Sequence, residues 1–392
     1  MTDTSAHTPT AVVVLGGGYA GTVAANRLQG RRDIAVTLVN PRPSFVERIR
    51  LHQLVADTGA AVREYAEVLQ PSVGLVIDTA SGIDAKNRQV HLGSGNTLSY
   101  DYLIYAVGSA AAPASIPGAA EFAYPISDLE NAQRLKGRLD QLHPSAPVCV
   151  VGGGLTGIET AAELAEQRPE GDVTLICGPV LGPSLSEPGR RSVARQLARL
   201  GVRVVRGCVT EIAERSVTLS DGQTLPSAVT VSTAGFSVPQ LAADSGLSTD
   251  SLGRLLTDET LTSVDDARIV AAGDAAAPSG QPLRMSCQAA IPLGAQAANT
   301  VLSRIAGEEP AVISQAFVGQ CVSIGRKLAI VQLSHTDDTP RRAYIAGRAA
   351  AVVKELICKG TVSGVAREGR KPGSAFWFRG GKRPAGEQVR VG

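Results

Sequence analysis

Residues 12–28 read VVVLGGGYAGTVAANRL: a short β-branched run, then G-G-G-x-x-G, then a helix-like stretch with small residues on one face. Residues 148–164, VCVVGGGLTGIETAAEL, repeat this pattern without a gap. A second apolar run follows each copy, at 34–40 and at 172–178. Each copy therefore predicts a strand, a helix and a second strand, which is the right-handed βαβ unit of a parallel sheet.

The repeat extends beyond the two βαβ units. Residues 87–109 match residues 214–236, and both segments have alternating apolar residues, a Gly-containing turn and a final apolar strand that ends in Ala-x-Gly or Ala-Gly. The predicted fold class is α/β, with two related Rossmann-like dinucleotide-binding domains that each contain a β-hairpin insertion.

The glycines of each turn have separate physical roles. The first permits a tight turn out of the strand, the second lets the backbone approach a pyrophosphate, and the third lets helix and strand pack closely. The free N–H groups at the start of the following helix favour phosphate. Two dinucleotides are expected, bound by Gly16, Gly18 and Gly21 and by Gly152, Gly154 and Gly157.

Composition narrows the class of protein. The formal net charge of +2 gives no electrostatic case for nucleic acid. Residues 1–10 are polar and lack the apolar core of a secretory signal, and no apolar run reaches the ~18 residues of a spanning helix. The six cysteines show no C-x-x-C spacing, so neither a metal site nor a disulfide framework is expected. We expect a cytoplasmic protein, at most peripheral at the inner face of a membrane.

A third motif lies in LTSVDDARIVAAGDAAAP, residues 261–278, where an apolar strand leads to Gly273 and Asp274. The carboxylate of Asp274 is placed to accept hydrogen bonds from ribityl hydroxyls. With three motifs in this order, residues 11–360 resemble the FAD-dependent pyridine-nucleotide oxidoreductases. This family includes disulfide reductases, type II NADH dehydrogenases, ferredoxin reductases and proteins like apoptosis-inducing factor.

The resemblance implies a cofactor for each turn. FAD is expected at the first glycine turn and at Gly108, Gly273 and Asp274, and NAD(P)H at the second turn. The implied domains are an FAD-binding domain at 1–115 and 237–310, an NAD(P)H-binding domain at 116–236, and a small α+β C-terminal interface domain with a basic tail at 311–392.

The ends of the second strands depart from the usual pattern, in which an acid binds a ribose 2′-hydroxyl. The FAD half has Asn40 with Arg42 nearby, and the nucleotide half has Cys177. Arg190, Arg191 and Arg195 are either within reach of a 2′-phosphate or a solvated helix face. The preference for NADH or NADPH stays open.

Residues 44–54, SFVERIRLHQL, occupy the place where the disulfide reductases of this family carry two cysteines on a helix, and here there are none. Electron transfer through a dithiol is therefore excluded, and direct transfer through flavin remains. Phe45, Ile49 and His52 would share one helical face. Arg48 or His52 would then favour the reduced flavin or contact the acceptor. The alternative is a surface charge cluster around Glu47 with a buried His52.

Two further residues follow from the resemblance. Glu159 matches a family glutamate near the nicotinamide, and its alternative role is that of an ordinary acid at a helix N-terminus. Residues 284–307 predict a helix kinked at Pro292, whose N-terminus points at the flavin in the family. Gln288 matches the first of two glutamines that flank quinone in type II NADH dehydrogenases, whereas Ile291 and Pro292 stand where the second is expected.

The C-terminal part predicts a hairpin at 317–333 and a helix at 341–360. The pair resembles the small domain that covers the flavin and supplies dimer contacts in type II NADH dehydrogenases, so a homodimer is expected. The tail after Gly360 has several basic residues around Phe376, Trp377 and Phe378 but no helical period. It suits an anionic membrane surface, an arm on a partner subunit or a disordered segment.

The leading functional prediction is an FAD-dependent NAD(P)H oxidoreductase that passes hydride to flavin and then electrons to a quinone or another small acceptor, without a redox disulfide. One alternative is a biosynthetic flavoprotein acting on a small organic substrate. The other is a redox-sensing flavoprotein that binds NAD(P)H and turns over slowly.

Overall fold

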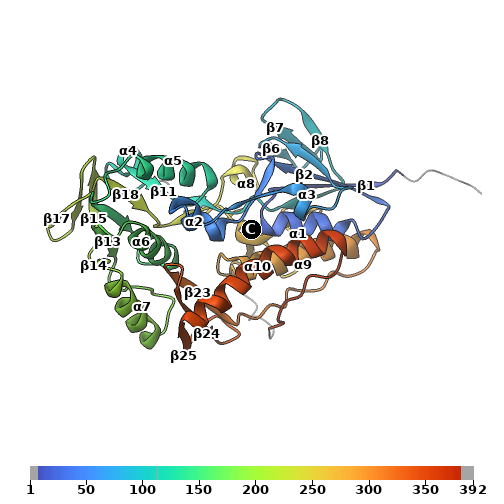
Figure 1. Ribbon diagram of the computed structural model, residues 1–392. Coiled ribbons are helices and arrows are strands. Elements are labelled where there is room, and N and C mark those ends of the chain that lie inside the picture. Colours follow the sequence, from blue (N-terminus) through green and yellow to red (C-terminus); the bar gives the residue numbers. More distant parts are fainter. Residues whose placement is uncertain (1–7, 113, 381–392) are drawn as a thin grey trace, which may run out of the picture.

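The computed structural model describes residues 8–112 and 114–380 of the 392. Two parallel five-stranded sheets form its halves, one at the right and one at the left of Figure 1. The prediction of an α/β fold is confirmed. The first sheet has the order β21-β9-β1-β2-β5. Its strands are β1 (Thr10–Leu15), β2 (Ile34–Asn40), β5 (Gly74–Ile77), β9 (Tyr102–Tyr105) and β21 (Ile269–Ala271).

Apolar side chains fix the middle of this sheet. Val14 of β1 and Ile104 of β9 are fully buried, as the unbroken apolar runs of a sheet covered on both faces require. The helices of this half are α1 (Tyr19–Leu28), α3 (Tyr65–Val68), α8 (Leu241–Asp244) and α9 (Cys287–Ile305), with the 3-10 turn η2 (Gly273–Ala275). A two-stranded sheet joins β20 (Leu255–Thr257) and β22 (Ala276–Pro278).

The second sheet repeats the first with the order β11-β18-β12-β13-β14. Its strands are β11 (Ala123–Pro125), β12 (Val148–Val151), β13 (Val173–Cys177), β14 (Arg203–Arg206) and β18 (Val229–Ser232). The helices of this half are α4 (Ala119–Phe122), α5 (Leu129–Asp140), α6 (Leu155–Gln167) and α7 (Glu187–Arg199).

Each predicted hairpin insertion is present and has a third strand. The insertions are the antiparallel sheets β6 (Ala80–Asp84), β7 (Gln89–Leu92), β8 (Thr97–Ser99) and β15 (Val209–Ala213), β16 (Ser216–Leu219), β17 (Thr224–Pro226). The two chain crossings between the halves pair with each other as β10 (Ala110–Ala111) and β19 (Phe236–Ser237). The domain limits drawn from the sequence fall near these crossings and stay a prediction.

The segment 44–54 does not form the predicted helix. It consists of the strand β3 (Ser44–Val46), the 3-10 turn η1 (Arg48–Arg50) and the short helix α2 (Leu51–Val55). β3 pairs with β4 (Val62–Glu64), and buried Phe45 packs edge-on against Tyr19, with ring centroids 5.1 Å apart. An aromatic residue beside a β-branched one favours a strand here, so the expectation that Phe45 and His52 share a helical face was wrong.

The hairpin predicted at 317–333 is confirmed as β23 (Gly319–Ile324) and β24 (Leu328–Ser334). The helix predicted at 341–360 is misplaced at both ends. Residues Pro340–Gly347 form β25, the third strand of that sheet, and α10 spans Arg348–Arg370. Gly347, with φ +83°, separates strand from helix, because a left-handed backbone there suits glycine alone.

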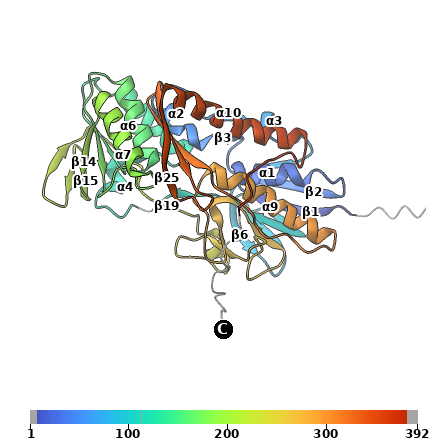
Figure 2. The same cartoon turned by 90° about the horizontal axis from the view of Figure 1, so that it is seen from below.

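The last ten residues of α10 overturn the prediction that the chain after Gly360 lacks a helix. α10 packs across α1 and α3 (Figure 2). Gly369 lies so close to α1 that a Cβ would stand 3.2 Å from the Asn26 amide. Beneath it, the Arg27 guanidinium donates to buried Glu368 at 2.8 Å. The prediction failed because Gly360, Gly364 and Gly369 are poor helix formers. The helix forms here because tertiary packing stabilises it.

Candidate functional site

The first glycine turn has the geometry that a dinucleotide needs. Gly16 has φ +99°, and a Cβ there would stand 2.3 Å from the Ala106 carbonyl oxygen. A Cβ at Gly21 would stand 1.8 Å from the Gly16 carbonyl oxygen. By contrast, a Cβ at Gly18 would meet nothing within 4 Å, and no side chain of the described residues caps the N-terminus of α1. Packing therefore requires Gly16 and Gly21, whereas Gly18 faces open space beside free N–H groups.

The second turn repeats this arrangement. Gly152 has φ +124°, and a Cβ at Gly157 would stand 1.8 Å from the Gly152 carbonyl oxygen. Gly154 again faces open space, and among the described residues no side chain caps α6. Both turns thus fit the phosphates of a dinucleotide, one in each half of the molecule.

Asn40 secures the first glycine turn from the end of β2. Its Oδ1 accepts from the Gly17 amide at 3.0 Å, and its Nδ2 donates to the Arg42 carbonyl at 2.7 Å. Tyr65 donates its hydroxyl proton to the Gly17 carbonyl at 2.8 Å. The Arg42 guanidinium pairs with Glu130 of α5 at 2.5 Å. Direct contact of Asn40 or Arg42 with FAD stays a prediction.

Arg48 and Asp274, 226 positions apart in the chain, come together at one hydroxyl. Ser109 donates to Asp274 Oδ2 at 2.7 Å and accepts from Arg48 Nη1 at 3.0 Å. Arg48 Nη1 lies 3.9 Å from Asp274 Oδ2. Ser109 follows Gly108, whose φ of +71° turns the chain at the end of β9. The loop after β9, the turn η2 after β21 and the turn η1 (Arg48–Arg50) thus present a hydroxyl, a carboxylate and a guanidinium side by side.

His52 and Glu159 belong to a buried group of four residues, here called the junction cluster: His52 of α2, Glu159 of α6, Ser323 of β23 and Lys354 of α10. Glu159 accepts from the ammonium of Lys354 and from the Ser323 amide, the latter at 3.0 Å. His52 Nδ1 lies 3.8 Å from Glu159 Oε2. The cluster therefore joins the first half, the second half and the C-terminal sheet and helix.

The cluster holds one carboxylate, one ammonium and a neutral imidazole at pH 7. Burial would raise the pKa of Glu159, but the charge and hydrogen bond of Lys354, together with His52 and the Ser323 amide, outweigh it, and the net shift is downward. Burial would likewise lower the pKa of Lys354, but Glu159, with smaller contributions from Cys321 and Cys358, reverses this to a net increase. Burial lowers the pKa of His52 to about 4, against the opposing charge of Glu159. His52 is therefore a hydrogen-bonding imidazole at this pH and Glu159–Lys354 is the ion pair.

A second buried carboxylate lies one helical turn along α6. Glu163 accepts from the Thr58 hydroxyl and lies 3.7 Å from Arg326 of the β23–β24 turn. Burial raises the pKa of Glu163. The negative charge of Glu159, one turn away on the same helix face, adds to this upward shift, while Thr58 and Arg326 oppose it.

Gln288 lies in the first turn of α9, as the predicted helix requires. In the orientation that satisfies both amide groups, its nitrogen donates to the Gly319 carbonyl at 3.0 Å and its oxygen accepts from the Val318 amide at 3.3 Å. Pro292 has no N–H for the Gln288 carbonyl, which accepts from Gln315 Nε2 at 2.7 Å instead. The predicted contact of Gln288 with a quinone stays a prediction.

Residues that the sequence did not single out complete both groups. Ser109, Ser323 and Lys354 are brought to the site by strand order and by the docking of α10, which no local pattern encodes. Of these three residues, only Ser109 could have been picked out from the sequence, because it directly follows the Ala-Val-Gly strand end at residues 106–108.

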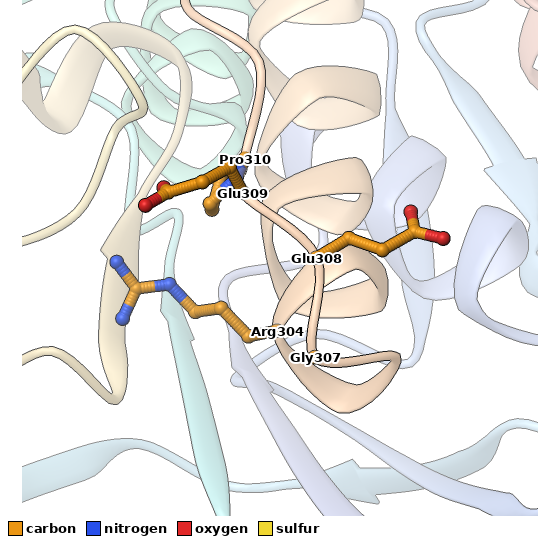
Figure 3. Close-up of a pocket in the computed structure, with 5 residues that line it drawn as sticks. All are labelled: Arg304, Gly307, Glu308, Glu309 and Pro310. Atoms are coloured by element: carbon orange, nitrogen blue, oxygen red, sulfur yellow. The ribbon is translucent and has the colours of Figure 1, made fainter.

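A shallow surface depression lies apart from these groups. It is lined by Arg304, Gly307, Glu308, Glu309 and Pro310, just after α9 ends (Figure 3). The Arg304 guanidinium already has a partner within this chain, because its Nη2 donates to the Thr262 hydroxyl at 2.8 Å. None of the residues predicted for the site lines this depression.

Comparison with known proteins agrees with this geometry. The family model described as pyridine nucleotide-disulphide oxidoreductase matches residues 10–294. An NADH dehydrogenase-like protein of Mycobacterium tuberculosis is 30% identical over 377 residues, which cover 89% of this chain and 93% of that protein. The type II NADH:quinone oxidoreductase Ndh of the same organism is 29% identical over 345 residues, with 76% of this chain and 74% of that protein covered.

Among solved structures, the sulfide:quinone oxidoreductase of Aquifex aeolicus matches with a TM-score of 0.77 over 92% of each chain. Its sequence identity is 20%, so the likeness shows the shared fold.

Proposed function

The chain belongs to the pyridine nucleotide-disulphide oxidoreductase family, and on this basis we propose that it oxidises NAD(P)H through bound FAD and passes the electrons to a quinone. The observation that carries the proposal is the duplicated glycine turn, open at Gly18 in one half and at Gly154 in the other. Two dinucleotide sites in one chain are what electron transfer between nicotinamide and flavin requires.

The cofactors are FAD and NAD(P)H. FAD supplies the ring that accepts hydride from nicotinamide and returns electrons to an acceptor. The turn at Gly16, Gly18 and Gly21 would hold its phosphates, and Asp274 would hold its ribityl chain. Gly152, Gly154 and Gly157 would hold the nicotinamide nucleotide. The six cysteines are unpaired and residues 44–54 contain none, so the proposal involves no redox disulfide.

The junction cluster acts on charge and protons rather than through sulfur. The Glu159–Lys354 pair keeps an ammonium inside the molecule, and His52 stays neutral beside it. Because Glu159 neutralises this ammonium, the pair would act on a ring docked nearby as an oriented dipole and not as a free positive charge. A quinone is proposed as the acceptor because the chain is similar to the type II NADH:quinone oxidoreductase Ndh.

Steady-state turnover tests the acceptor. The purified yellow protein is mixed with NADH or NADPH and a soluble quinone, and oxygen and ferricyanide serve as comparison acceptors. Fast nucleotide oxidation that depends on the quinone supports the proposal. A long-lived charge-transfer complex with a change in oligomeric state would instead favour the redox-sensing alternative.

The proposed homodimer would form through α10. Leu356, Val352 and Ile357 project from this helix with exposures of 64%, 60% and 47%, and Ile345 of β25 is also exposed. Such a patch is typical of an interface. Leu356→Asp would convert a dimer to a monomer in light scattering, whereas Lys86→Asp, on an exposed side chain of the β6–β7 turn away from α10, is the control. A monomeric wild-type protein would refute the proposal.

Location at a membrane surface is a second proposal about partners. No helix among the described residues has the length and hydropathy to span a membrane. Trp377 is anchored on this chain, with its Nε1 donating to the Ser314 carbonyl at 2.9 Å, while Phe376 and Phe378 are exposed. Residues 381–392, the rest of the basic tail, lie outside the described residues.

Flotation with anionic liposomes tests this contact. The double variant Phe376→Ala/Phe378→Ala should lose flotation, whereas Trp377→Phe retains it. A chain truncated after Gly360 would not test the membrane contact alone. It also lacks the end of α10 and Glu368, which pairs with Arg27 of α1. Equal flotation of wild type and the double variant, or none for either, refutes the membrane contact.

A further inference from the structure

The strand ends that face the two dinucleotide sites differ in chemistry. β2 ends at Asn40, whose amide is bonded to the first glycine turn. β13 ends at Cys177, which is fully buried and packs against the second turn, where a Cβ at Gly153 would stand 2.5 Å from the Cys177 Cβ. Residues 178–186, GPVLGPSLS, contain no acid. The carboxylate that normally accepts from a ribose 2′-hydroxyl, and repels a 2′-phosphate, is therefore missing here.

A cation stands at the same edge of the sheet. β14 runs parallel to β13, and Arg206, its last residue, is in register with Cys177. The Cys177 carbonyl accepts from the Gly207 amide at 3.0 Å, which fixes the chain on both sides of this point. Burial raises the pKa of the Cys177 thiol, and the positive charge of Arg206 opposes this shift.

The Arg206 guanidinium is exposed and uncommitted. Across residues 8–112 and 114–380, no carboxylate forms an ion pair with it. Two of the three arginines that the sequence offered for this role have other partners, and the third, Arg195, is exposed in the middle of α7. Arg191 pairs with Glu187 at 3.4 Å, and Arg190 donates to the Leu185 carbonyl at 3.3 Å.

Space is open beside this strand end. A Cβ at Gly154 or at Gly178 would meet nothing within 4 Å. The loop after Gly178 folds back onto the glycine turn, with the Gly182 amide donating to the Gly153 carbonyl at 2.7 Å. The adenosine end of a dinucleotide held at the second turn would thus find open space and a guanidinium instead of a carboxylate, with the Cys177 thiol buried beneath the turn.

We infer that Arg206 binds the 2′-phosphate of NADPH and that the second site prefers 2′-phosphorylated nucleotides over NADH. A guanidinium matches the geometry and charge of a phosphate, and no acid opposes it. The inference rests on the proposed function, because it assigns the nucleotide of that same second site.

Binding of two adenosine nucleotides tests the inference without any electron transfer. Calorimetry on the FAD-loaded protein compares adenosine 2′,5′-bisphosphate with 5′-AMP. Wild type should bind the bisphosphate about tenfold or more tightly than AMP. Arg206→Ala should weaken bisphosphate binding by about 10- to 100-fold and leave AMP binding unchanged, and Arg206→Lys should retain part of the difference.

Arg203→Ala is the matched control. Arg203 lies on the same strand but opposite Thr174, and it pairs with Asp172 at 3.9 Å, so its loss should leave both affinities unchanged. Equal affinity of the wild type for the two nucleotides, or equal loss of both in Arg206→Ala, overturns the inference.

Anaerobic flavin reduction separates this inference from the proposed function. Reduction by NADPH faster than by NADH supports both. Reduction by NADH alone overturns the assignment of Arg206 and leaves the proposed function standing. The absence of reduction by either nucleotide overturns the proposed function, while the calorimetric comparison still decides the role of Arg206.

Discussion

Lys354 forms a buried ion pair with Glu159, which lies 195 positions earlier in the chain. Only about a tenth of either side chain is exposed. The pair joins α10 of the C-terminal part to α6 of the nucleotide half, and Ser323 and His52 complete its surroundings. A family position first identified Glu159, and the structure supplies the partner that keeps its carboxylate ionised.

Removal of the ammonium should destabilise the protein. Lys354→Met keeps the chain length but leaves Glu159 buried without a partner, a change that costs about 3–5 kcal/mol. The expected result is a large fall in melting temperature for Lys354→Met. The double variant Glu159→Gln/Lys354→Met should recover much of it, because no charge is then stranded. Melting curves that leave Lys354→Met as stable as wild type would show that the pair contributes nothing.

Stability should decrease in mild acid because of His52. Its folded pKa is about 4 and its unfolded pKa about 6.5, so the unfolded chain takes up a proton first as the pH falls. This stability is fully present above pH 6.5 and is lost between about pH 6.5 and 4, amounting to about 3 kcal/mol. Urea unfolding of His52→Asn across this window should show a shallower dependence on pH. An unchanged slope would contradict the buried neutral imidazole.

The glycines should divide into two classes when replaced by alanine. Gly154→Ala places a methyl group in open space with an ordinary φ of −74°, so the fold should be unaffected. The affinity for NAD(P)H should fall by about tenfold, because the methyl occupies the approach to the phosphates. Gly157→Ala meets the Gly152 carbonyl and should cost about 2 kcal/mol or more in stability.

Gly18→Ala and Gly21→Ala form the corresponding pair for FAD. The first should yield a folded protein with less flavin, and the second a destabilised one. Circular dichroism, thermal melting and flavin content measure the two effects separately. A Gly18→Ala protein with full flavin content would remove Gly18 from the cofactor site.

Asp274 should govern flavin retention more than Ser109 does. Asp274→Ala removes the carboxylate predicted to hold the ribityl chain and should give largely colourless protein. Ser109→Ala removes one hydrogen bond to Asp274 and should weaken flavin binding by about 1 kcal/mol. The dissociation constant of FAD, measured by reconstitution of apoprotein, checks both. Equal flavin affinity in Asp274→Ala and wild type would refute the role of Asp274.

The features predicted correctly are those that local chemistry fixes. The turns at 12–28 and 148–164 need glycine at fixed positions because carbonyl oxygens stand within 2.4 Å of where a Cβ would lie, as at Gly16 and Gly21. The same need appears at Gly157. Such a requirement fixes which residue stands at each of these positions, so it can be recognised in the sequence. The fold class and the family resemblance were both predicted from these glycines.

The features missed depend on partners distant in sequence. β3 forms because it pairs with β4, and β25 forms because it pairs with the free edge of β24. The spacing of apolar residues therefore predicted a helix wrongly at Phe45 and at 341–347. Lys354 lies on a helix with no distinctive local pattern, and only the docking of α10 brings it to Glu159. Arg206 lies beside Cys177 only because β14 pairs with β13 in this register.

Anaerobic titration of the FAD-loaded protein tests the central claim most directly, namely that nicotinamide reduces a flavin in this chain without sulfur chemistry. The account predicts stoichiometric bleaching of the yellow absorbance by NADH or NADPH, full return of the colour on addition of a quinone, and the same behaviour after alkylation of the exposed thiols. A protein that takes up no FAD, or whose flavin stays oxidised with both nucleotides, would contradict it.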